Sequence, residues 1–98
     1  MKLKKVYQHT TDIVGTLTKY EAGNYLAKVW SEPESGKITS ITTEPNNPLM
    51  QPSIDVYENG QVILSVAELI DFPPEKVDKI IENLQHAKEV AEELRKLL

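Results

Sequence analysis

The sequence contains no cysteine, and it has one tryptophan, one phenylalanine and a single arginine, Arg95. Without cysteine, the chain forms neither disulfides nor thiolate metal sites. Its apolar runs stop far short of the roughly 18 residues that a membrane span requires. Lysines stand near the start, but no apolar segment follows them as in a signal peptide. We therefore expect a small soluble protein of the cytoplasm, with no membrane partner.

Charge is spread unevenly along the chain, whose formal net charge is −4. Residues 1–50 carry six lysines against five acids, whereas residues 51–98 carry five basic residues against ten acids. An acidic second half repels phosphate backbones, which disfavours nucleic acid as a partner. Acidity of this kind either solvates a helix face or speeds the encounter with a basic protein.

Turn residues divide the first part of the chain into short segments. Gly, Pro, Asn and Ser gather in EAGN (21–24), SEPESG (31–36), EPNNP (44–48) and ENG (58–60). Between them, segments rich in Thr, Ile, Val and Tyr predict strands near 13–20, 24–30, 37–43, 53–57 and 61–66. Such short loops join antiparallel neighbours, because a parallel crossover needs a dozen residues or more.

The order of these segments predicts the fold class. Strands come first and one long helix comes last, which is typical of an α+β layer pair. We predict a single domain over residues 1–98, with an antiparallel sheet of about four to five short strands packed against one long C-terminal helix. The strands lie within about 5–70 and the helix spans about 74–97.

The hairpin SIDVYENGQVILSV fixes a register. A two-residue turn at Asn59-Gly60 would place Asp55 on the same face as Leu64. A three-residue loop, with Gly60 left-handed, instead puts the apolar residues on one face: Ile54, Val56, Val62, Leu64 and Val66. We predict the three-residue loop. In the preceding loop, EPNNPLMQPS, we expect Leu49 and Met50 to plug the edge of the core, with a partner-binding tip as the alternative.

The helix begins at Pro73-Pro74, because proline suits a first turn whose N–H groups have no intrahelical acceptor. Asp71 is placed to cap it, and Phe72 to pack back onto it. Apolar residues then recur at spacings of three and four: Val77, Ile80, Leu84, Ala87, Ala91, Leu94 and Leu98. At about 37 Å, this helix is longer than strands of five to eight residues, which span about 17–26 Å.

We predict that the excess length lies at the C-terminal end of the helix, where Val90 and Leu97 turn away from the early apolar arc. The chain itself could cover this end, by a diagonal crossing or with residues 3–7. We favour a second chain, because a contiguous exposed apolar patch marks an interaction site. The predicted protein interface consists of Val90, Leu94, Leu97 and Leu98. Its simplest form is a homodimer of antiparallel helices.

Residues with catalytic chemistry are few. His86 is expected on the solvent face of the helix, and His9 with Asp12 resembles a base and its orienting acid without a nucleophile. The acids Glu89, Glu92 and Glu93 are most simply a solvated cluster. No nucleotide-binding loop or metal-binding motif occurs. We therefore predict no enzyme, no catalytic residue, no metal and no cofactor.

The function that these patterns favour is a small non-enzymatic protein-binding or regulatory module, such as an adaptor, inhibitor or accessory protein. The identity of its partner does not follow from the residues. One alternative is a nucleic-acid-binding sheet, in which aromatic residues stack bases beside lysines: Tyr20, Tyr25 and Trp30 with Lys19, Lys28 and Lys37. Another is a small acidic inhibitor or immunity-type protein from a mobile element.

Overall fold

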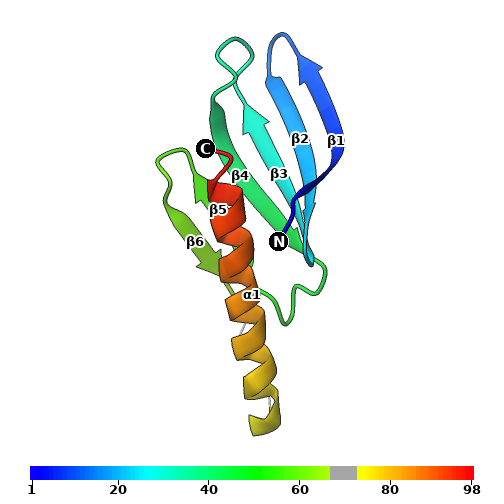
Figure 1. The fold of residues 1–98 in the computed structure, drawn as a ribbon, viewed down its shortest axis with the longest axis vertical. Helices are drawn as coiled ribbons and strands as arrows, with labels where there is room; N and C mark the ends of the chain where they lie inside the picture. The colour runs from blue at the N-terminus through cyan, green and yellow to red at the C-terminus, as the bar shows by residue number, and fades with distance from the viewer. Residues whose placement is uncertain (67–72) are drawn as a thin grey trace.

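The computed structural model describes residues 1–66 and 73–98. Its elements are β1 (Lys4–Thr11), β2 (Gly15–Ala22), β3 (Tyr25–Ser31), β4 (Ile38–Pro45), β5 (Ser53–Tyr57), β6 (Val62–Ser65), the 3-10 turn η1 (Pro74–Lys76) and α1 (Val77–Arg95). The strands form one antiparallel sheet in chain order, and α1 crosses one of its faces (Figure 1). The predicted α+β class is confirmed, with six strands in place of the four or five expected.

Strand β1 is the element that the sequence analysis missed. All its residues except Thr11 are exposed, and Val6 and Tyr7 are its only large apolar residues. It gains order by pairing with β2, and a register shift between Lys5 and Tyr7 interrupts that pairing. Lysines and an irregularity suit an edge strand, because they discourage further strand addition. Its alternation is therefore too weak to predict a strand from the residues alone.

The three-residue loop of the β5–β6 hairpin is confirmed. Gly60 has a φ of +86°, and its N–H donates to the Tyr57 carbonyl oxygen at 2.9 Å. The Tyr57 N–H in turn donates to the Gln61 carbonyl oxygen at 2.9 Å. The pairs that result are Val56–Val62, Asp55–Ile63 and Ile54–Leu64. Asp55 thus lies on the face opposite to Leu64, as the pattern of apolar residues predicted.

The core lies between α1 and one face of the sheet. Its buried sheet residues come from four strands: Ala22, Tyr25, Ala27, Val29, Ile41, Ile54 and Val56. The helix contributes Ala87, Val90, Ala91 and Leu94. Two alanines on the inward side let the helix backbone approach the sheet closely, so that Val90 and Leu94 fill the remaining space. All four helix residues belong to its C-terminal half.

The start of the helix agrees in part with prediction. Pro74 opens the 3-10 turn η1, and Val77 begins the α-helix. The expected cap at Asp71 and the expected packing of Phe72 lie outside the described residues. Among those residues, no helix combines the length and the hydrophobicity that a membrane span needs.

Candidate functional site

The N-terminal half of α1 extends past the end of the sheet. In Figure 1 the yellow turns project beyond every strand, while the red turns lie over β5, and the molecule measures 51 Å along its long axis against 24 and 22 Å. Three apolar side chains on the projecting half are exposed: Val77 by 41%, Ile81 by 48% and Leu84 by 38%. Ile80 beside them is half-buried. We call Val77, Ile81 and Leu84 the overhang stripe.

Most of the predicted interface residues lie in the chain's own core. Val90 and Leu94 are fully buried against the chain's own sheet, and Leu97 packs against the same core. Of the four predicted residues, only Leu98 is well exposed, by 45%. The helix does outrun the sheet, but at the end opposite to the one predicted. The small residues Ala87 and Ala91 belong to the segment of the helix that packs against the sheet.

The overhang stripe also points in a different direction from the buried residues. At 100° per residue, with Val77 at zero, the four buried positions centre near about 270° and the stripe near about 0°. The side chain of Arg95, which falls on the same line as Val77, approaches within 3.9 Å of the position that a Cβ on Gly60 would occupy. The stripe therefore lies on the flank of the helix that faces the β5–β6 hairpin.

Charged side chains stand around the stripe without neutralising partners among the described residues. Lys88 continues its line toward the C-terminus, and Asp78 stands beside its first residue. The ion pairs of the described chain are Lys28–Glu44, Lys37–Glu58, Lys79–Glu82 and Lys96–Glu93. Neither Lys88 nor Asp78 belongs to these pairs of the described residues, and both residues are exposed.

Strand β6 adds exposed apolar residues at the neighbouring edge of the sheet. Leu64 pairs with buried Ile54 and shares its face, yet it is 38% exposed, and Val66 just after the strand is 59% exposed. The helix lies nearest β5. On this face of β6, Val62 packs against the core, whereas Leu64 stays exposed. The face predicted for the hairpin is therefore buried at Ile54 and Val56 but open at Leu64.

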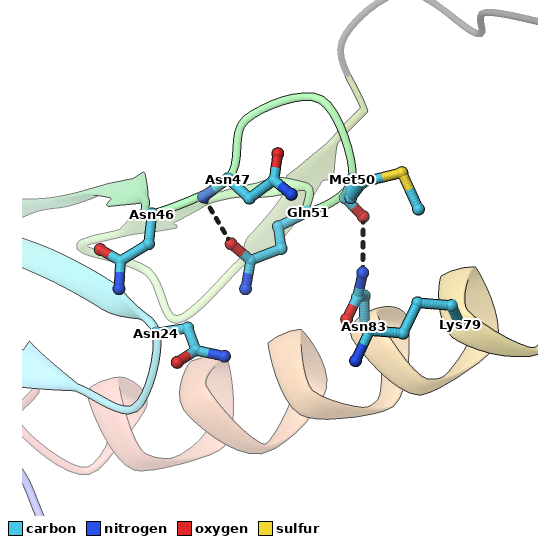
Figure 2. A pocket seen from close by; sticks show the side chains of 7 residues that line it. All are labelled: Asn24, Asn46, Asn47, Met50, Gln51, Lys79 and Asn83. Atoms are coloured by element: carbon cyan, nitrogen blue, oxygen red, sulfur yellow. Dashed lines mark hydrogen bonds between the residues drawn. The ribbon is translucent and has the colours of Figure 1, made fainter. Parts of the chain in front are cut away.

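A polar hollow of about 300 Å³ lies on the other flank of α1, between the helix, the β2–β3 turn and the β4–β5 loop (Figure 2). Two of its amides hold the loop: the Gln51 Oε1 accepts from the Asn47 N–H at 2.8 Å, and the Asn83 Nδ2 donates to the Met50 carbonyl oxygen at 3.0 Å. The remaining lining residues are Asn24, Asn46 and Lys79. The lining residues are amides, one lysine and one methionine, without the aromatic side chains that are common in small-molecule sites. The Gln51 bond closes the loop on itself, and the Asn83 bond anchors the loop to the helix.

The same loop corrects the prediction that Leu49 and Met50 plug the core. Leu49 is 69% exposed, so it fills no gap, whereas Met50 is half-buried. The residues that are buried here are Gln51 and Pro52, at the end of the loop. The buried side chains of this loop are therefore those of Pro52 and of Gln51, whose Oε1 accepts a main-chain hydrogen bond, rather than those of Leu49 or Met50.

His86 does not lie on the solvent face as predicted. Its Nε2 accepts a 3.4 Å hydrogen bond from the Asn24 N–H, and its ring stacks on Tyr25 with 6.1 Å between ring centres. The sheet-facing direction of the helix is turned from the one inferred from the apolar stripe, and this brings His86 to the flank above the β2–β3 turn. Burial also raises the pKa of Tyr25 to about 12.

The other histidine forms no site. His9 lies exposed on β1 and Asp12 lies exposed in the following turn, and no hydrogen bond joins their side chains in the described chain. Within residues 1–66 and 73–98, no three His, Asp or Glu side chains are grouped so that they could hold a metal ion.

The open face of the sheet differs from the base-stacking surface considered in the sequence analysis. Trp30 lies opposite Leu17 and Ser40, on the face away from the helix. Tyr25 is buried in the core and Tyr20 packs against that core, so both lie on the covered face. The three aromatic residues therefore do not share one surface.

The lysines on this open face are also engaged. The Lys28 Nζ lies 2.6 Å from the Glu44 Oε1, and this hydrogen bond lowers the pKa of the Glu44 carboxyl. The Lys19 Nζ lies 5.1 Å from the centre of the Tyr7 ring, as in a cation–π contact. A surface that bound phosphates would need cations free of such partners.

Comparisons of the chain with protein-family models, with curated proteins and with solved structures gave no match.

The overhang stripe carried a signal in the sequence that was assigned to the wrong role. The sequence pattern predicts that the early apolar arc, to which Val77, Ile81 and Leu84 belong, faces the sheet, because the later apolar residues of the helix turn away from that arc. The alanines at 87 and 91 are the better indicator of close packing, since only small side chains let a helix backbone approach a sheet. Length alone shows that an overhang exists but not at which end.

Proposed function

We propose that this chain is a non-enzymatic protein-binding module that docks a partner protein on the overhang stripe. The observation that carries the proposal is a helix half that leaves Val77, Ile81 and Leu84 between 38% and 48% exposed beyond the sheet. An amphipathic helix whose apolar side is unpaired is suited to contact with another helix or a groove. The residues recur at i, i+4 and i+7, which is the spacing that such contacts use.

The size of the stripe bounds the strength of the contact. Burying the exposed part of each of its three side chains contributes about 1 kcal/mol, or about 3 kcal/mol together. Association costs about 4–15 kcal/mol in lost freedom of motion. The stripe therefore binds weakly by itself, and the partner must add contacts of its own. Lys88, Asp78 and the exposed Leu64 and Val66 provide charged and apolar groups for that purpose.

Nucleic acid is the less favoured partner. The described aromatic residues are divided between the two faces of the sheet, and the net charge of the chain is −4. Base stacking on a sheet requires aromatic residues on one face together with cations that track the backbone. The open face offers Trp30 for stacking, but Lys28 is paired with Glu44.

A substitution on the stripe tests the proposal. In extracts of the native host, tagged wild-type chain and the variant Ile81→Asp are compared for the proteins that they retain. Ile13→Asp is the matched control, because Ile13 is 91% exposed in the β1–β2 turn and lies outside the stripe. We expect one set of proteins to be retained by the wild type and by Ile13→Asp and lost with Ile81→Asp. Equal retention by all three would reject the stripe as the binding surface.

A further inference from the structure

We propose that the partner of the overhang stripe is a second copy of this chain, with the two helices packed antiparallel along their N-terminal halves. This inference rests on the proposed function, because it names the protein that the stripe binds. A symmetric pair needs one self-complementary patch. The stripe offers such a patch, since its apolar residues lie in the centre and unlike charges lie toward its two ends.

The helical positions define the arrangement. A twofold axis level with the midpoint between Ile81 and Leu84 sets Ile81 of one copy against Leu84 of the other. The stripe is turned about 90° from the sheet-facing side of the helix, so the mate's helix packs beside α1 rather than between α1 and the sheet. The C-terminal half of the mate then continues past Val77, away from the first sheet. The two sheets lie at opposite ends of the pair and do not collide.

Charge favours the antiparallel arrangement over the parallel one. With the same axis, Lys88 of one copy stands level with Val77 and Asp78 of the other, and the pair forms twice. A parallel arrangement would place Lys88 beside Lys88 and Asp78 beside Asp78. Neither side chain has an ion-pair partner within the described residues. Unlike charges at the two ends of one apolar patch thus specify the direction of pairing.

The small area of the contact limits the affinity of the pair. The three side chains of each stripe and the two ion pairs cover far less than the roughly 1,600 Å² of a standard interface. Leu64 at 38% and Val66 at 59% exposure lie at the sheet edge on the flank that the stripe faces, and they extend the apolar surface available to the mate. We therefore expect a dissociation constant on the order of 10 μM to 1 mM.

Sedimentation equilibrium of the purified full chain tests this inference, at concentrations from about 10 μM to 1 mM. We expect a monomer–dimer equilibrium for the wild type and for the control Ile13→Asp. Ile81→Asp should raise the dissociation constant about tenfold or more, because it buries a charge at the centre of the contact. Circular dichroism of each variant verifies that it is folded, which the exposure of Ile81 leads us to expect.

Charge reversal tests the direction of pairing. Lys88→Asp and Asp78→Lys should each raise the dissociation constant about fivefold, and the double variant should restore it, because the reversed pairs are again unlike. Rescue is not expected of parallel helices, so an Ile81-dependent dimer without rescue would overturn the antiparallel arrangement.

The outcomes for the two proposals are distinct. A wild type that stays monomeric throughout, while host proteins are still retained through Ile81, would overturn the second copy and leave protein binding intact. A monomer that also retains no protein through Ile81 would overturn both.

Discussion

The Tyr25 hydroxyl donates a 2.6 Å hydrogen bond to the Pro52 carbonyl oxygen, and both residues are buried. The bond joins β3 to the end of the β4–β5 loop, immediately before β5. It crosses β4, which lies between these strands in the sheet. The loop is thereby fastened on one side by Tyr25 and on the other by Asn83, whose amide donates to the Met50 carbonyl oxygen.

Removal of this hydroxyl should destabilise the fold. Tyr25→Phe keeps the ring in the core and leaves the buried Pro52 carbonyl oxygen without its donor, so we expect a loss of about 1–2 kcal/mol in the free energy of unfolding. Urea denaturation followed by Trp30 fluorescence measures it. Tyr57→Phe, on an exposed tyrosine at the end of β5, is the matched control and should change stability little. Equal effects of the two changes would contradict the structural role of the bond.

The raised pKa of Tyr25 predicts a loss of stability in alkali. The folded state holds the Tyr25 proton up to about pH 12, whereas an unperturbed tyrosine has a pKa of 10.0. Between these values the unfolded state releases the proton first and is favoured. Stability is thus fully present below pH 10 and falls as the pH rises toward 12, by about 2 kcal/mol from this residue. The fall should be shallower in Tyr25→Phe, and parallel pH profiles for the two proteins would rule out this source.

A threonine side chain replaces a strand hydrogen bond between β4 and β5. The Thr43 hydroxyl donates to the Ile54 carbonyl oxygen at 2.9 Å and accepts from the Ile54 N–H at 2.7 Å, in a buried position. Thr43→Val fills the same space but leaves both main-chain groups unpaired, which should cost about 2–4 kcal/mol. Thr43→Ser keeps the hydroxyl and should cost less than Thr43→Val. Chemical denaturation of both variants measures the two losses of stability. A larger loss for Thr43→Ser than for Thr43→Val would show that the methyl group contributes more than the hydroxyl.

Alanine substitutions at two glycines distinguish the cost of backbone strain from that of steric collision. Gly15 has a φ of +102°, and a Cβ there would lie 2.0 Å from the Ser31 carbonyl oxygen. Gly60 has a similar φ of +86°, but its Cβ would meet only the Arg95 guanidinium, at 3.9 Å. Gly60→Ala should therefore cost about 1–2 kcal/mol from strain alone. Gly15→Ala should cost several kcal/mol more, because main chain must move. Thermal melts that give equal losses would contradict the close approach of β2 and the end of β3.

The residues predict the fold class and the β5–β6 register well, because both depend on local signals. Asn59-Gly60 selects a turn, and alternation between Ile54 and Val56 selects a face, so neighbours in the chain determine neighbours in space. The position of the helix on the sheet is different in kind. It depends on which apolar segment of the helix packs best against the sheet. Both halves are apolar enough to do so, the N-terminal half through Val77, Ile81 and Leu84 and the C-terminal half through Val90 and Leu94. The polar contacts of His86 and Asn83 follow from that placement, and no sequence pattern predicts them separately.

The placement of the helix predicts opposite behaviour for two aliphatic residues on it. Leu94 is fully buried, whereas Ile81 is 48% exposed on the overhang. Leu94→Ala should lower the free energy of unfolding by about 2–5 kcal/mol, because it leaves a cavity between the helix and the sheet. Ile81→Ala, in dilute solution where the chain is monomeric, should change it by less than about 0.5 kcal/mol. Urea denaturation at low micromolar concentration measures both without interference from self-association. Leu94→Glu should unfold the chain outright, because it would bury a carboxylate among the apolar residues of the core. A larger loss for Ile81→Ala than for Leu94→Ala would mean that the N-terminal half of α1, not the C-terminal half, covers the sheet.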